Sequence, residues 1–194
     1  MRTKDRLKEF SLHENAVRII SRSGFEGLSM QKLARASRIS AATIYVYFKN
    51  REDLLNKVYI RLEEEYHDAI MTGFNPLMPL EEGLWLQWRN IYRFIADKPT
   101  HYRFLEQFRH SPLIAHNEVA FIKNKMAIFF QNAIRVRELV PMPTEMLMAA
   151  AFGPLYNIIR ISGEEKVINS SEFILSERKL KALFDVTLKG LRPV

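Results

Sequence analysis

Residues 29–51, SMQKLARASRISAATIYVYFKNR, contain the clearest indication of the fold of this chain. They predict two short helices, over 30–36 and 41–48, joined by a tight turn. Ser29 and Ser40 are suitable N-caps, because a serine hydroxyl accepts a hydrogen bond from the free N–H groups of the first helical turn. The inward faces are apolar at helical spacing, with Met30, Leu33, Ala34, Ile44 and Phe48.

The outer surface of the second helix carries two tyrosines. Ile44 and Phe48 already occupy the inward face, and adjacent residues of a helix cannot share that face, so Tyr45 and Tyr47 are expected outside. A helix-turn-helix lays its second helix in the major groove of DNA. The stretch therefore predicts a DNA-binding helix-turn-helix. The alternative is that the two tyrosines are core aromatics of an ordinary small bundle.

The expected DNA contacts are of two kinds. Tyrosine hydroxyls and basic side chains on phosphates fix position without reading sequence. Base reading would fall to small side chains, through methyl contacts with thymine, and to the residues beside the turn. The candidate DNA-binding residues are Ser29, Gln31, Arg38, Ala41, Ala42, Thr43, Tyr45, Val46, Tyr47, Lys49 and Arg51.

The flanking sequence predicts further helices and no strand. A first helix over 4–23 ends at Gly24, and a fourth, capped by Asn50, runs from Arg51 to about Met71. A loop rich in glycine and proline over 73–79 then marks a domain boundary. Later helices are expected at about 80–98, 100–111, 116–138, 143–162 and 172–191.

The predicted fold class is all-α, with about nine helices. We expect a helix-turn-helix domain over residues 1–50, with the fourth helix, 51–72, as connector. Residues 73–194 would form a helical ligand-binding and dimerisation domain.

The positive charge is concentrated near the N-terminus. Residues 1–61 contain 13 Lys and Arg against 6 Asp and Glu, whereas residues 62–194 contain 16 of each. The whole net charge of +7 therefore lies in the N-terminal third. Such an excess is expected of a surface that faces DNA phosphate. The alternative is a basic tail that only increases solubility.

Several classes of protein are disfavoured by the composition. No apolar run approaches the ~18 residues of a membrane span, and the charged N-terminus is unlike a signal peptide, so we expect a cytoplasmic protein with no membrane partner. The absence of cysteine excludes disulfides and thiolate metal sites. We expect no metal and no cofactor, although His110 and His116 would permit a weak metal site. No catalytic motif is present, so we expect no enzyme.

The residues that open and close the predicted helices resemble the signature of the TetR family of transcriptional regulators. The matching residues are Gly24-Phe25, Leu28-Ser29-Met30, and Ser40-x-x-Thr43-Ile44-Tyr45-x-Tyr47-Phe48-Lys49-Asn50-Arg51-Glu52-Asp53-Leu54. The resemblance implies that Thr43, Tyr45, Tyr47 and Lys49 bind operator phosphates and that Ala41, Ala42 and Val46 lie against base edges. The chain departs from the family at the turn, where Ser37 or Arg38 must replace the usual glycine. Ala42 stands where the family has glycine, proline or alanine, which leaves the base preference open.

The resemblance also implies a homodimer formed by the last two long helices. The sequence supports this independently, because the last helix has a wide apolar stripe and residues 146–161 are apolar nearly all round. Pro154 predicts a kink or break near Gly153. The alternative is a central helix buried in a monomer. The candidate dimer residues are Ala150, Leu155, Leu180, Leu183, Phe184, Thr187, Leu188 and Leu191.

A small apolar or aromatic ligand is implied by the resemblance, and aromatic residues supply a cavity lining. The candidate pocket residues are Trp85, Trp88, Tyr92, Phe104, Phe108, Phe121 and Tyr156. For any one of them, the plain core is the competing interpretation. Glu106 would face a cationic ligand or, as we prefer, solvent.

The sequence thus predicts a ligand-responsive repressor that binds a pseudo-palindromic, double-stranded operator as a homodimer. In the first rival hypothesis, a ligand-binding or protein-interaction module retains the helix-turn-helix only as scaffold. In the second, the protein is a small-molecule enzyme.

Overall fold

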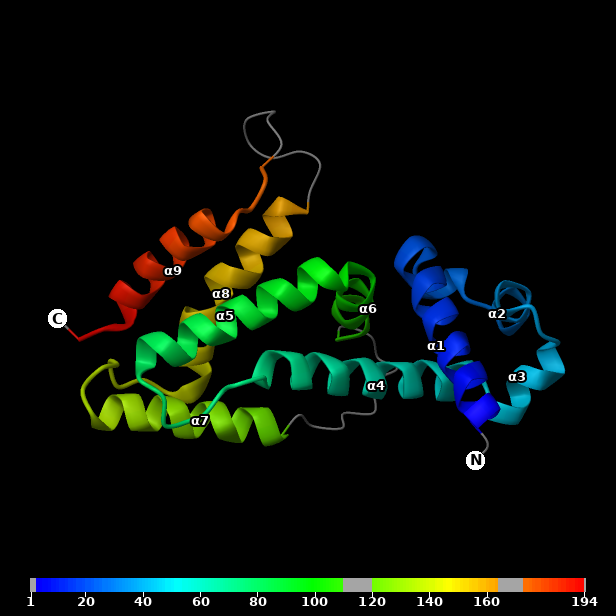
Figure 1. Ribbon diagram of the computed structural model, residues 1–194, viewed down its shortest axis with the longest axis horizontal. Helices are drawn as coiled ribbons and strands as arrows, with labels where there is room; N and C mark the ends of the chain where they lie inside the picture. Colours follow the sequence, from blue (N-terminus) through cyan, green and yellow to red (C-terminus); the bar gives the residue numbers. More distant parts are fainter. Residues whose placement is uncertain (1–2, 110–119, 164–172, 194) are drawn as a thin grey trace. The chain divides into compact units, whose positions relative to one another are not determined.

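The computed structural model describes residues 3–109, 120–163 and 173–193, and in these ranges it contains nine α-helices, one short 3-10 helix and no strand (Figure 1). This confirms the predicted all-α class. The bounds are α1 Thr3–Ser23, η1 Phe25–Gly27, α2 Met30–Ser37, α3 Ala41–Tyr47, α4 Arg51–Met71, α5 Leu80–Asp97, α6 Pro99–Arg109, α7 Ala120–Arg135, α8 Thr144–Ser162 and α9 Glu177–Leu191.

Helices α9 and α8 show two informative differences from the expectation. The last helix begins at Glu177 instead of 172, because Ser176 caps it by accepting a hydrogen bond from the Lys179 N–H. Pro154 does not break α8, which continues to Ser162. The proline removes the N–H that would bond to the carbonyl of Ala150.

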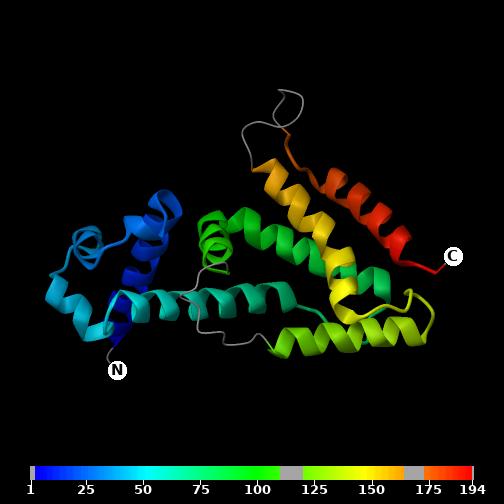
Figure 2. The ribbon, with the colours of Figure 1, turned by 180° about the vertical axis from the view of Figure 1, so that it is seen from behind.

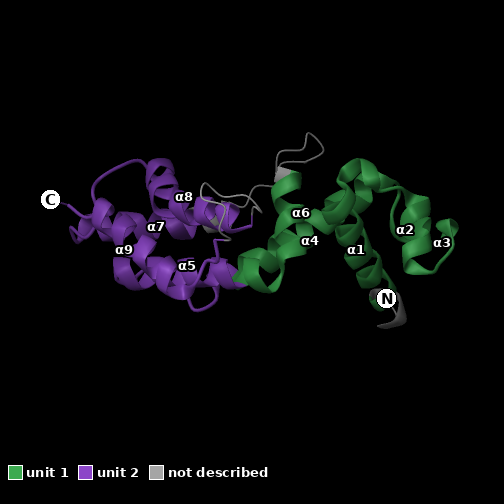
Figure 3. Cartoon of the chain, turned by 90° about the horizontal axis from the view of Figure 1, so that it is seen from above, with its two compact units in different colours: residues 1–69, 94–118 green, residues 70–93, 119–194 purple. Residues whose placement is uncertain are grey.

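The chain divides into two compact units (Figure 3). Unit 1 comprises residues 1–69 and 94–118, and unit 2 comprises residues 70–93 and 119–194. Two of the boundaries fall inside α4 and α5, so each of these helices contributes residues to both units.

The core of unit 1 joins α1 to α6, which are far apart in the sequence. Phe104, Leu105 and Phe108 of α6 are fully buried, and α6 packs against α1. The Phe108 ring lies 5.5 Å from the ring of Phe25 and 4.7 Å from that of Tyr59, centroid to centroid. These three aromatic rings therefore belong to the apolar core of unit 1.

Charged residues connect helices α1, α4 and α6 beside this core. Glu14 of α1 accepts a hydrogen bond from Arg61 of α4 at 2.5 Å, and its second oxygen lies 3.2 Å from Nε2 of His101 in α6. Nδ1 of His101 lies 3.1 Å from Glu65, which also pairs with Lys98. Burial raises the pKa of the Glu14 carboxyl, but the hydrogen bonds from Arg61 and His101 outweigh burial and lower it below its ordinary value.

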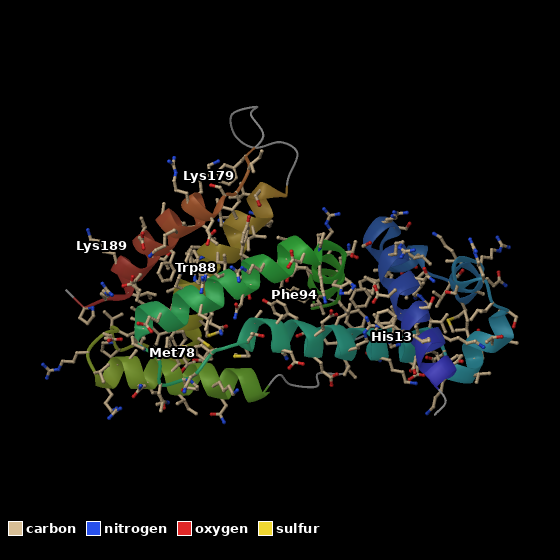
Figure 4. All side chains as sticks on the ribbon, in the orientation of Figure 1. His13, Met78, Trp88, Phe94, Lys179 and Lys189 are labelled. Atoms are coloured by element: carbon tan, nitrogen blue, oxygen red, sulfur yellow. The ribbon has the colours of Figure 1, made fainter. Side chains whose placement is uncertain are left out.

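The core of unit 2 is built around Trp88, which has no exposed surface. Its indole N–H donates to the Ala151 carbonyl of α8 at 2.9 Å (Figure 4). The rings of Trp85 and Trp88 lie 5.0 and 5.3 Å from that of Phe184 in α9. Helices α8 and α9 lie side by side in both views of the ribbon (Figures 1 and 2).

Most of the apolar stripe assigned to a dimer interface is used inside the chain instead. The buried members of that set are Leu155, Leu180, Phe184, Leu188 and Leu191. Leu183 and Thr187 are half-buried, and Ala150 is exposed. The stripe therefore contributes to the core of unit 2.

Candidate nucleic-acid interface

Helix α2 begins and ends as its sequence predicts. The Ser29 hydroxyl accepts a hydrogen bond from the Lys32 N–H at 3.1 Å. Leu33 and Ala34 are buried, which orients the helix on its domain. At the other end, Arg38 has φ 54° and ψ 41°, in the left-handed region. Arg38 therefore takes the place of the missing glycine.

The left-handed residue reverses the chain tightly between the two helices. The Arg38 N–H donates to Arg35 O at 3.2 Å, and the Ile39 N–H donates to Ala34 O at 3.1 Å. These bonds satisfy carbonyls that the end of a helix leaves free. The turn therefore fixes the direction in which the chain enters α3.

Helix α3 is anchored by its inward side chains. The Ser40 hydroxyl accepts a hydrogen bond from the Thr43 N–H at 3.1 Å, while Ile44 and Phe48 are buried. Tyr45 and Val46 point outward, with exposed fractions of 55% and 78%. The helix ends at Tyr47, one residue before the expected end, because Phe48 has extended backbone angles.

A polar cluster connects the end of α3 to the start of α4. The Asn50 side chain caps α4 by accepting a hydrogen bond from the Asp53 N–H at 2.8 Å. The Asp53 carboxylate accepts the Lys49 N–H at 2.9 Å and lies 3.2 Å from the Lys57 ammonium. Lys57 also donates to Tyr47 O at 3.1 Å, so it caps the last turn of α3.

The electrostatics of this cluster favour the ionised aspartate. Burial raises the pKa of the Asp53 carboxyl, but the Lys49 N–H and the Lys57 ammonium lower it below its ordinary value. The sequence interpretation missed Lys57. Its signal was the i, i+4 spacing from Asp53, which favours an ion pair on a helix.

The predicted DNA-binding residues divide by exposure. The exposed ones are Ser29, Gln31, Arg38, Ala42, Tyr45, Val46 and Lys49, and the half-buried ones are Ala41, Thr43, Tyr47 and Arg51. Lys32 and Arg35 of α2 are also exposed and were not predicted. Lys32, Arg35 and Arg38 therefore add positive charge beside the turn.

Arg51 and Thr43, two residues of the predicted contact set, have partners at other positions of the same domain. The Arg51 guanidinium donates a hydrogen bond to the carbonyl of Phe25 and so joins α4 to η1. The Thr43 hydroxyl lies 2.8 Å from the Ser40 hydroxyl. Both residues therefore hold the helix-turn-helix in shape.

His13 of α1, which Figure 4 labels, packs against Phe48, the buried residue that follows α3. Its ring is buried, lies 5.5 Å from the Phe48 ring, and has no hydrogen-bond partner on either nitrogen. Burial, and then the positive charge of Arg61, lower the pKa of His13 to about 4. The ring is therefore neutral at neutral pH and acts as part of the apolar support beneath Phe48.

The predicted ligand-pocket residues are divided between the two units. Trp85, Trp88, Tyr92 and Tyr156 belong to unit 2, whereas Phe104 and Phe108 belong to unit 1. The Tyr92 hydroxyl donates to Leu175 O at 3.0 Å. The side chain of Phe121, like His110 and His116, lies outside the part of the chain that the structure describes. The pocket assignment stays a prediction.

A different part of unit 2 contains a surface cavity of about 610 Å³. It is lined by Pro79, Glu81, Glu82, Arg137, Glu138, Arg192 and Pro193. Two of these acids already have partners, since Glu81 pairs with Arg192 at 2.9 Å and Glu138 accepts the Leu80 N–H at 2.8 Å. Among the described residues no cluster suits a metal ion. None of the described helices is long and apolar enough to span a membrane.

Comparisons with known proteins agree with this geometry. Residues 12–58 match the family described as bacterial regulatory proteins, tetR family. An HTH-type transcriptional regulator of Haemophilus influenzae is 34% identical over 95 residues, which are 49% of this chain and 51% of that protein. The aligned part of the chain spans about half the length of the curated relatives that it matches.

Solved structures share the fold over nearly the whole chain. A TetR family regulator from Marinobacter aquaeolei VT8 has a TM-score of 0.77 and 21% identity, with 100% of both chains covered. A TetR-family regulator from Haemophilus influenzae also has a TM-score of 0.77, with 23% identity and coverage of 99% of this chain and 100% of that one. Residues 12–58 thus match the tetR family of bacterial regulatory proteins, and the chain shares the helical fold of solved TetR family regulators.

Proposed function

We propose that the protein is a DNA-binding transcriptional regulator, and specifically a repressor that binds a pseudo-palindromic operator as a homodimer and responds to a small ligand. The observation that carries the proposal is the surface of α2 and α3. Both helices are capped and anchored from behind, and their outer side chains remain exposed. A protein that binds chromosomal DNA in bacteria would act in the cytoplasm.

The exposed side chains suit DNA phosphate and base edges. Lys49 follows α3, and Arg38 occupies the turn, so both basic groups flank the helix that would enter the groove. The charge excess in residues 1–61 supports the same surface. Tyr45 adds a hydroxyl that can donate to a phosphate oxygen.

We propose the exposed face of α8 and α9 as the dimer contact. Small residues lie along the middle of this face, where they would let two helix pairs approach closely. Ala149, Ala150 and Gly153 are exposed on α8, and Ala182 and Val186 are exposed on α9. A dimer would place two reading helices about 34 Å apart, one turn of DNA. Ala150→Glu should then convert the dimer to monomer in sedimentation analysis, and an unchanged dimer would refute this surface.

The proposed ligand response requires that ligand binding and DNA binding be thermodynamically linked. A ligand releases DNA only if it binds the DNA-free state more tightly than the DNA-bound state. Helix α4 contributes residues to both units, which makes it the proposed path of coupling. The aromatic residues predicted to line a pocket remain the candidate ligand contacts.

The test is selection of an operator from a random duplex library with the purified protein, followed by affinity measurement over a range of salt concentrations. Phosphate contacts predict a steep fall of affinity with salt. Lys49→Ala should weaken binding and reduce the salt slope by about 0.9 per lost contact. Arg135→Ala, which removes an exposed charge at the end of α7, is the matched control.

A rival function predicts a different result. A ligand-binding or protein-interaction module that keeps the helix-turn-helix as scaffold would select no operator and show a flat salt dependence. Equal affinity in Lys49→Ala and Arg135→Ala would refute the assignment of the α3 surface to DNA.

A further inference from the structure

We propose that Val46, with Ala42, reads thymine methyl groups in the operator, so that the half-site is chosen for A·T pairs beneath α3. The inference rests on the proposed DNA binding and specifies what that surface recognises. It begins from Val46, which at 78% has the highest exposed fraction among the large hydrophobic residues that the structure describes.

The outer surface of α3 offers methyl groups to a base pair and few polar groups. The segment Ala41–Tyr47 contains no Arg, Lys, Asn, Gln, Asp or Glu, which are the side chains that read guanine, adenine or cytosine by hydrogen bonds. Thr43 has a hydroxyl, but this hydroxyl is already paired with Ser40.

Val46 and Ala42 lie four residues apart, and both are exposed, so they share one side of the helix. The methyl side chain of Ala42 lets the helix approach the base edges closely. Among the base edges of the major groove, only thymine presents a methyl group for an apolar partner. The chemistry of this side of α3 therefore matches thymine.

Valine is suited to hold its methyl groups in a fixed place. A β-branched side chain in a helix has one strongly preferred χ1 rotamer, so little conformational freedom remains to be lost on contact. The backbone of α3 is itself fixed, by the Ser40 cap at its start and by Lys57 on Tyr47 O at its end. The two methyl groups of Val46 therefore have a defined position relative to the bases.

The size of the effect follows from the area that one methyl group buries. A buried group of this size contributes about 0.8 kcal/mol, which corresponds to about a fourfold change in Kd. Loss of one thymine methyl in each half-site of a palindrome should then weaken binding about 16-fold, if the two sites act independently.

The experiment uses the full chain and the duplex selected from the random library. Each thymine is replaced singly by deoxyuridine, which pairs with adenine but lacks the methyl group. We expect about fourfold weaker binding at one or two positions in each half-site. Cytosine at those positions should also weaken binding, and 5-methylcytosine should recover about fourfold, because it restores the methyl group without restoring the A·T pair.

Val46→Ala assigns the effect to its residue. In this variant, deoxyuridine should no longer weaken binding at the position that Val46 contacts, while other positions keep their sensitivity. Val136→Ala makes the same change at an exposed valine after α7 and should retain the wild-type pattern. Circular dichroism and sedimentation of each variant establish that the fold and oligomeric state are unchanged.

The outcomes separate this inference from the proposed function. Steep salt dependence and tight binding with no deoxyuridine effect would refute methyl reading and leave DNA binding standing. A deoxyuridine effect that persists unchanged in Val46→Ala would refute the role of Val46. An altered oligomeric state in Val46→Ala would assign the residue to a protein contact instead. Failure to select any duplex would refute the proposed function itself.

Discussion

Replacement of Arg38 by glycine should make the protein more stable and a weaker DNA binder at once. A residue with a β-carbon in the left-handed region costs roughly 1–2 kcal/mol, and Arg38 adopts φ 54° there. Glycine removes this cost but loses about 0.5–1 kcal/mol through the greater freedom of the unfolded chain. The net gain in the free energy of unfolding should be about 0.5–1 kcal/mol.

The DNA-binding effect has the opposite sign, because the same change removes an exposed guanidinium beside the reading helix. If Arg38 binds phosphate, the slope of log affinity against log salt should fall by about 0.9 for each lost contact. Arg38→Ala is the matched control. It removes the same charge but keeps a β-carbon in the left-handed region, so it should lose affinity without gaining stability.

The stability measurement must report on unit 1. Both tryptophans, Trp85 and Trp88, lie in unit 2, so tryptophan fluorescence would follow the wrong unit. Scanning calorimetry of both variants should show the midpoint of the unit 1 transition raised by roughly 2–8 °C in Arg38→Gly only. Equal midpoints in Arg38→Gly and Arg38→Ala would refute the backbone argument, and unchanged salt slopes in both would refute the phosphate contact.

Three further changes test other parts of the structure. Since the unfolded chain protonates His13 near the ordinary histidine pKa of 6.5 and the folded chain only near 4, the free energy of unfolding should fall by about 2–3 kcal/mol as pH falls between these values. Urea unfolding of His13→Leu should lack this part of the pH dependence, and a slope equal to that of the wild type would refute it. Gly83→Ala places a β-carbon 2.5 Å from the Phe129 ring, so the free energy of unfolding measured in urea should fall by about 1–3 kcal/mol. The β-carbon of Gly190→Ala meets nothing within 4 Å, so this variant should stabilise α9 slightly. Trp88→Phe should cost about 2–4 kcal/mol, because it opens a cavity and removes the indole hydrogen bond to α8; a loss below about 1 kcal/mol would contradict the central place of this residue.

Local chemistry in the sequence predicts the helix ends well. Ser29, Ser40 and Asn50 each cap the expected helix, because capping depends on a side chain and the backbone within the next few residues. The sequence left Ser37 and Arg38 as alternatives at the turn. The choice of Arg38 depends on backbone angles, and both residues are equally poor substitutes for glycine.

Contacts between distant segments are much harder to predict. The apolar periodicity of α9 shows that one face is buried, but not that Trp85 and Trp88 of the same chain cover it. The position of Arg51 suits a phosphate contact, and its guanidinium also donates to the backbone carbonyl of Phe25. A pattern of side chains cannot predict this second contact, because its acceptor belongs to the backbone. In both cases the face of a helix is encoded locally, whereas its partner is set by the tertiary fold.

The packing of α6 against α1 has a consequence for how the protein is made. Phe104, Leu105 and Phe108 reach the ribosome exit only after the helix-turn-helix has been synthesised, and until then the apolar surface of α1 that they cover stays open to solvent. The nascent helix-turn-helix would therefore be incompletely stabilised during this interval. A chain truncated after α4 would expose the same surface permanently, and we expect it to aggregate or to recruit chaperones more than a chain that continues through α6.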